Sequence, residues 1–84
     1  MSDETEYIYP SGFEKAIVGV DLYQGRWVMD KYLMCQILID EDGMSEEDAI
    51  DFLSYNVWGC SVGEHTPIYM DSGSFDELTN LLGL

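Results

Sequence analysis

The feature that most constrains this fold is a helix stop followed at once by a helix start, near residue 43. Gly43 suits the left-handed position that often follows the last turn of a helix. Ser45 precedes three acidic residues and can accept a hydrogen bond from the backbone of Asp48, which is typical of a helix N-cap. Two helices separated by so few residues must fold back on one another, so the sequence predicts an αα-hairpin.

Each of the two predicted helices has one apolar face. The first is expected from about Lys31 to about Asp42 with Asp30 as its N-cap, and the second from Ser45 to a stop at Gly59. Apolar residues recur in both at helical spacing. The residues predicted to be buried are Leu33, Met34, Ile37 and Leu38 in the first helix, and Ala49, Ile50, Phe52, Leu53 and Val57 in the second.

Residues 13–29 are predicted to form a β-hairpin. Apolar, β-branched runs lie at 16–20 and 27–29, and Gly25 between them can supply the positive φ that a tight turn requires. Trp27 is expected in the core.

Two further elements follow the helices. Residues 66–70 are predicted to be a third strand, in which Pro67 must lie at the start or on an edge because it cannot donate to the ladder. Ser74 opens a short terminal helix, and Phe75 is expected to be buried with the other apolar residues of that helix.

The element order ββααβα predicts an α+β fold. We expect a small antiparallel three-stranded sheet covered by the αα-hairpin and the short C-terminal helix. Residues 13–84 are expected to form this single domain, and residues 1–12 a flexible acidic tail.

Charge excludes several functions. The 84 residues carry 17 carboxylates and 3 basic side chains, a net charge of −14, so direct binding to nucleic acid or to an anionic membrane is excluded. The 46% hydrophobic content predicts a folded rather than a disordered chain. No apolar run of membrane-spanning length occurs, and the acidic N-terminus is unlike a secretory signal. We therefore expect a cytoplasmic protein with reduced cysteines.

Acidic residues concentrate at the helix stop and start. Seven of the twelve residues 40–51 are acidic and none is basic. A calcium loop starting at Asp40 would place Met44 at a ligand position and Ser45 where glycine is required, so no dedicated metal site is expected, nor any other cofactor. The remaining alternatives are a solvated turn and a surface that binds a partner.

Part of this charge is locally unfavourable. Glu46, Glu47 and Asp48 meet the positive end of a helix dipole, whereas the acids at 40–42 meet a negative end. An arrangement without local benefit suggests a function. The predicted partner contacts are Asp40, Glu41, Asp42, Glu46, Glu47 and Asp51. Tyr55 and Trp58 are predicted to be half-exposed anchors beside them; alternatively, they close the core.

Catalysis has little support in the sequence. Cys35 falls on an apolar helix stripe and is expected in the core, while Cys60 and His65 are close enough for a Cys–His pair to be conceivable. A chain of this length has little room for a pocket besides its core, so we predict that it is not an enzyme.

The stretch from about Phe13 to Asp71 resembles a family of short, uncharacterised acidic proteins of bacteriophages and prophages. The residues that carry the resemblance are 16–19 (AIVG), 44–50 (MSEEDAI), 55–57 (YNV), 63–64 (GE) and 66–68 (TPI). The resemblance implies a viral origin. It carries over no catalytic or binding residue.

Phage genomes encode many small acidic proteins that block host nucleases, restriction enzymes, CRISPR effectors or repair enzymes, some of them as DNA mimics. The first hypothesis is therefore an inhibitor that binds a basic, nucleic-acid-binding host protein. The alternative is a small structural or regulatory homo-oligomer, in the simplest case a homodimer, whose charge only gives solubility.

Overall fold

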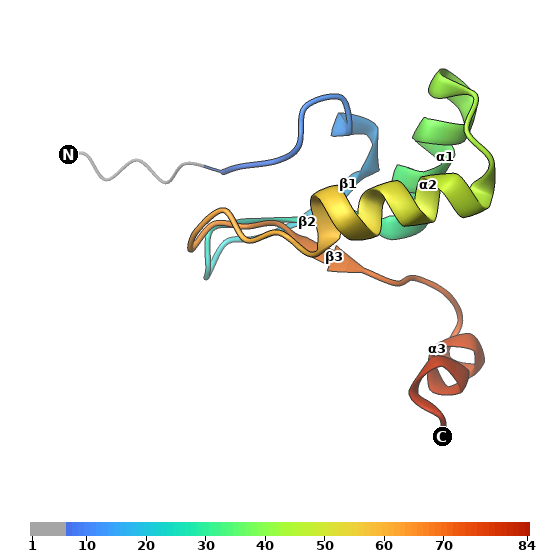
Figure 1. Cartoon of the computed structure of the whole chain (residues 1–84). Helices are drawn as coiled ribbons and strands as arrows, with labels where there is room; N and C mark the ends of the chain where they lie inside the picture. Colours follow the sequence, from blue (N-terminus) through green and yellow to red (C-terminus); the bar gives the residue numbers. More distant parts are fainter. Residues whose placement is uncertain (1–6) are drawn as a thin grey trace.

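A computed structural model describes residues 7–84 (Figure 1). A 3₁₀ turn at Glu14–Ala16 leads into strand β1, and a π-helical segment, Ser54–Trp58, continues helix α2. The main elements are β1 (Ile17–Asp21), β2 (Arg26–Asp30), α1 (Lys31–Asp42), α2 (Glu46–Leu53), β3 (Ile68–Met70) and α3 (Phe75–Leu82). The expected order and the α+β class are confirmed.

The three strands form a mixed sheet in the order β1-β2-β3. β1 and β2 are antiparallel, with Asp21 opposite Arg26, and a bulge interrupts the register at Val18. β3 lies parallel to β2, with Val28 opposite Ile68, so the prediction of a fully antiparallel sheet is wrong. The reason is the connection: α1 and α2 carry the chain back across the sheet, so β3 enters beside β2 in the same direction.

Helix α1 and the start of α2 lie where the sequence predicts them, whereas α2 ends at Leu53 and only the π-helical segment continues to Trp58, next to the predicted stop at Gly59. Asp30, only 7% exposed, accepts hydrogen bonds from the backbone N–H groups of Tyr32 (2.8 Å) and Leu33 (3.2 Å) and so caps α1. After α1, Gly43 takes a left-handed conformation with φ of 71°. The Ser45 hydroxyl accepts from the Asp48 N–H at 3.1 Å and starts α2. This turn sets the place of every acidic residue between 40 and 51.

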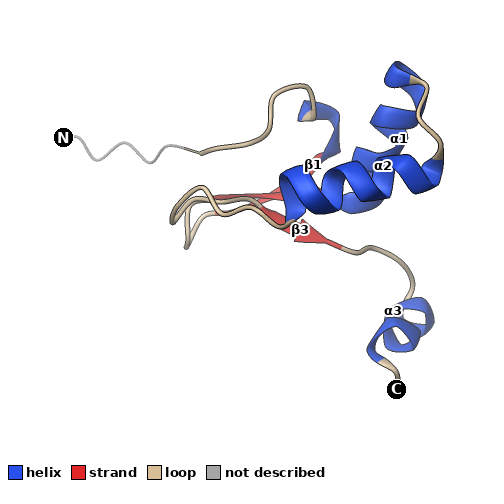
Figure 2. Ribbon diagram, viewed as in Figure 1, coloured by secondary structure: helices blue, strands red, loops and turns tan. Residues whose placement is uncertain are grey.

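The core lies between the sheet and the αα-hairpin (Figure 2). The buried residues of the core are Phe13, Ala16, Met29, Met34, Cys35, Leu38, Ala49 and Leu53. Trp27, on β2, is half-buried against this core.

The second helix buries a narrower face than the sequence predicts. Ala49 and Leu53 are buried and Val57 is half-buried, whereas Ile50 and Phe52 are 42% and 41% exposed. The reason is that α2 packs on α1 along one ridge, which buries positions spaced by four and leaves the flanking ones open.

The C-terminal helix does not cover the sheet, contrary to the prediction. α3 lies apart from the sheet and the αα-hairpin (Figure 1), and its Phe75, predicted to be in the core, is 80% exposed. α3 is nevertheless well formed, because Ser74 and Glu77 make a reciprocal capping box and Gly83 ends the helix in a left-handed conformation.

Part of the predicted N-terminal tail can be placed. Residues 1–6 lie outside the described residues, and the remainder begins with Tyr7, whose ring centroid is 5.5 Å from that of Trp27. Ile8, Tyr9 and Pro10 line a hollow with residues of the π-helical segment.

Candidate functional site: the acidic turn and the adjoining groove

The turn between α1 and α2 carries a dense set of exposed carboxylates, which we call the acidic turn. Two of its helix-terminal positions illustrate the local electrostatics: Asp42 is the last residue of α1, and Glu47 lies in the first turn of α2. The dipole of α1 opposes the first charge and that of α2 favours the second. The acidic turn comprises Asp40, Glu41, Asp42, Glu46, Glu47, Asp48 and Asp51, all exposed.

The carboxylates of the acidic turn do not all face one way. Asp40 and Glu41 line a hollow that also contains Lys15, and Glu41 pairs with Lys15 at 3.9 Å. Glu46 lies on another side, where it lines a groove with Cys35. Negative charge therefore reaches solvent in more than one direction.

Basic side chains do little to neutralise this charge. The Lys15–Glu41 pair is exposed, so it is worth at most about 1 kcal/mol. Lys31 pairs with Asp71 at 3.6 Å, outside the acidic turn. The guanidinium of Arg26 donates to the backbone oxygen of Thr66 at 2.5 Å, also outside it. Since these are the three basic residues of the chain, most of the acidic turn is electrostatically uncompensated.

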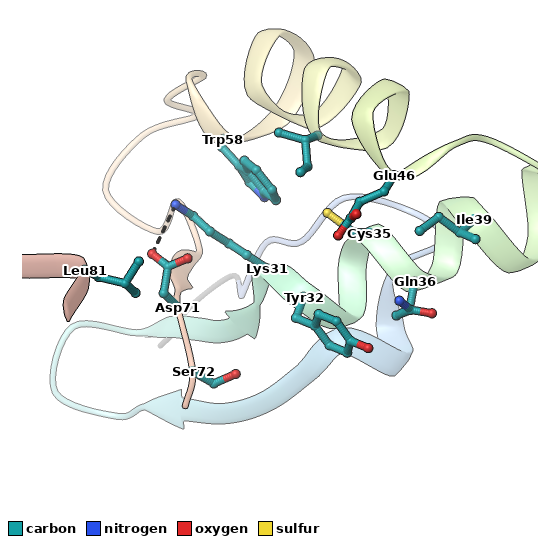
Figure 3. Close-up of a pocket in the computed structure, with 11 residues that line it drawn as sticks. Lys31, Tyr32, Cys35, Gln36, Ile39, Glu46, Trp58, Asp71, Ser72 and Leu81 are labelled. Carbon is teal, nitrogen blue, oxygen red and sulfur yellow. Dashed lines mark ion pairs between the residues drawn. The ribbon is translucent and has the colours of Figure 1, made fainter. Parts of the chain in front are cut away.

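A groove of about 340 Å³ borders the acidic turn (Figure 3). It runs between α1 and α2, and the linker that follows β3 closes one end. Its lining is largely apolar, with charged groups at the rim. We call this the α1–α2 groove; its lining residues are Lys31, Tyr32, Cys35, Gln36, Ile39, Glu46, Ile50, Trp58, Asp71, Ser72 and Leu81.

The two predicted aromatic anchors occupy different environments. Tyr55 is 83% exposed on the π-helical segment. Trp58 is half-buried and faces the α1–α2 groove, as Figure 3 shows. Its indole N–H donates to the sulfur of Met34 at 3.4 Å, and the Lys31 ammonium lies 5.0 Å from the ring centroid. Trp58 thus closes the core and also forms a wall of the groove.

The thiols are in contrasting surroundings. Cys35 is buried at the floor of the groove, and this burial, with a smaller contribution from the nearby Glu46 carboxylate, raises the pKa of its thiol. Cys60 is exposed and donates to the backbone oxygen of Asn56 at 3.5 Å, whereas Nδ1 of His65 contacts the backbone oxygen of Gly25 at 2.9 Å. The conceivable Cys–His pair therefore has its members engaged with different carbonyl groups.

The described part of the chain contains no cluster of potential metal ligands. Among residues 7–84, no group of three or more His, Cys, Asp or Glu side chains is arranged to hold an ion.

Sequence reasoning did not identify the α1–α2 groove. It depends on how two helices pack, which no local motif specifies. One signal was present: Tyr32, Cys35 and Ile39 recur at i, i+3 and i+7, a second apolar stripe beside the one assigned to the core. A helix with two adjacent apolar stripes contacts more than one neighbour.

Comparison with known proteins adds no identification. No family model matches the chain, and neither do the curated proteins or the solved structures. Within residues 7–84, every helix is too short or too polar to cross a membrane.

Proposed function

We propose that this protein is a non-enzymatic, phage-encoded inhibitor that acts in the cytoplasm of the host cell. It binds a basic, nucleic-acid-binding protein of the host, such as a nuclease, a CRISPR effector, or a restriction or repair enzyme. The observation that carries the proposal is the acidic turn: seven exposed carboxylates lie within twelve residues, and among residues 7–84 only Lys15 forms an ion pair with one of them.

The mechanism is electrostatic competition with nucleic acid. A groove that holds phosphates presents lysine and arginine side chains, which form charge-assisted hydrogen bonds with carboxylates equally well. The net charge of −14 accelerates encounter with such a groove and disfavours acidic partners. Because Asp40 and Glu41 lie on a different side of the turn from Glu46, the acidic turn would contact a concave basic site on more than one side.

Local stability supports a selected function for this charge. Asp42 ends α1, where the helix dipole disfavours it by about 0.3–1 kcal/mol, and its neighbours in the acidic turn add repulsion. A turn that served only to connect two helices would gain stability by replacing these acids. Retaining them is understandable if a partner supplies the compensating positive charge.

The experiment is a comparison of two triple variants in capture from bacterial lysate at low and high salt. One variant neutralises the acidic turn (Asp42→Asn, Glu47→Gln, Asp51→Asn). The matched control neutralises three exposed acids elsewhere (Glu14→Gln, Glu64→Gln, Asp76→Asn), so both variants have the same net charge.

We expect the wild-type chain and the control to retain a basic host protein at low salt and to release it at high salt. The acidic-turn variant should bind it at least about tenfold more weakly, since three charge-assisted contacts are lost. Equal loss in both variants would show that only net charge matters. Failure to retain any basic protein at low salt would refute the proposal.

A further inference from the structure

Helix α3 is a completed helix whose apolar face is left largely uncovered by residues 7–84. Its eight residues are capped at both ends, yet Phe75, Leu81 and Leu82 are 80%, 68% and 72% exposed. These residues and Leu78 recur at helical spacing and make one apolar face. A helix of two turns is unstable alone in water, so this face requires another surface to cover it.

The α1–α2 groove has the shape that a third helix requires. On α1, Tyr32, Cys35 and Ile39 line it over a length of about 10 Å, and Ile50 of α2 forms the facing wall. An eight-residue helix is about 12 Å long, so α3 matches the groove in length. Amphipathic helices bind such grooves through residues spaced by three and four, which is the spacing on α3.

The linker directs α3 away from the groove of its own chain. At one end, Asp71 is held to Lys31 by an ion pair of 3.6 Å. At the other end, the Glu77 side chain folds over Gly73 so closely that a Cβ there would lie 2.8 Å from Oε1 of Glu77. α3 lies apart from the αα-hairpin (Figure 1), and Leu81 is its one residue that lines the groove (Figure 3).

We propose that the α1–α2 groove is filled by α3 of a second copy of this chain, and that two copies exchange α3 reciprocally in a two-fold dimer. The apolar face of α3 offers on the order of 400 Å². Two helices and the two grooves that receive them would together bury about 1,600 Å², the size of a stable protein–protein interface. One α3 folded onto its own chain would bury half of that.

Charge makes this dimer recognisable by its salt dependence. Each copy carries −14, so the two copies repel each other at low ionic strength and associate more tightly as salt screens them. Binding of a basic partner through the acidic turn would instead weaken as the salt concentration rises. The dimer does not rest on the proposed inhibitory function, and either can fail without the other.

The test is sedimentation equilibrium of the full chain at 20 mM and 300 mM NaCl, with two variants that change charge equally. Leu82→Asp places a carboxylate on the apolar face of α3, and Asn80→Asp places one on the exposed polar face. We expect a dimer that tightens with salt, a dissociation constant raised at least about 100-fold by Leu82→Asp, and little change with Asn80→Asp. Circular dichroism checks that both variants fold.

A mixing experiment identifies the exchanged helix. Ile50→Asp damages the groove and leaves α3 intact, whereas Leu82→Asp does the reverse, because Leu82 is not among the residues that line the groove. A mixed pair contains one intact helix facing one intact groove, so the mixture should associate more tightly than either variant alone. A wild-type chain that remains monomeric at 300 mM salt, a dimer insensitive to Leu82→Asp, or a mixture no tighter than its components would overturn the proposal.

Discussion

Neutralising Asp42 should leave the protein more stable than neutralising Glu47 does. Asp42→Asn and Glu47→Gln each remove one exposed charge from the acidic turn with little change in side-chain volume or helix propensity. Both substitutions relieve repulsion from the surrounding carboxylates. They differ in the helix dipole, because Asp42 ends α1 and Glu47 lies in the first turn of α2.

The magnitude follows from these positions. Removing Asp42 gains about 0.3–1 kcal/mol of dipole energy and removing Glu47 loses a similar amount, so their free energies of unfolding should differ by about 0.6–2 kcal/mol. For a domain of this size the melting temperatures should differ by about 2–16 °C. Relief of repulsion stabilises both variants, whereas the helix dipoles act on them with opposite signs.

The assay is urea unfolding followed by tryptophan fluorescence, at 20 mM and at 1 M NaCl. At 1 M salt the screening length is about 3 Å, so the difference should shrink towards zero. Equal stabilities of the two variants at low salt would refute the dipole argument. A difference that persisted unchanged at 1 M salt would indicate packing, not electrostatics.

Two further predictions concern α1. Asp30→Ala should lower the free energy of unfolding by about 1–2 kcal/mol, measured by the same urea titration, because the buried carboxylate accepts two backbone N–H groups at the start of α1. The raised pKa of the Cys35 thiol means that the folded state holds this proton above pH 9.0, the ordinary value, so stability should fall as pH rises through and beyond it. Iodoacetamide mapping should accordingly find Cys60 alkylated well before Cys35 in the folded protein, and comparable rates would contradict this reasoning.

Local signals in the sequence predicted the αα-hairpin well. Asp30, Gly43 and Ser45 each act through hydrogen bonds or backbone angles that involve only a few neighbouring residues, so α1 and the start of α2 could be placed to the residue. Gly25, with φ of 69°, lies in the predicted hairpin turn for the same reason.

Features that depend on packing were not predicted. The direction of β3 follows from the whole connection through α1 and α2, which no local pattern encodes. Phe75 was expected in the core because its helix is amphipathic, but amphipathicity does not say which surface covers a helix. The α1–α2 groove was not predicted either, because it depends on how the two helices pack against each other. At the candidate site, the sequence predicted that the carboxylates of the acidic turn are exposed. It did not predict that they face more than one direction.

The parallel pairing of β2 with β3 also determines the order in which the chain can fold. β3 cannot join the sheet until residues 31–67 have been synthesised and folded, because they bring its start beside β2. Until then β2 has an open edge that other chains can pair with. The long connection of residues 31–67 must be ordered before β2 and β3 can pair, and this slows folding relative to a sheet whose neighbouring strands are joined by short turns. Early formation of the αα-hairpin, whose contacts are local, shortens this aggregation-prone interval during translation.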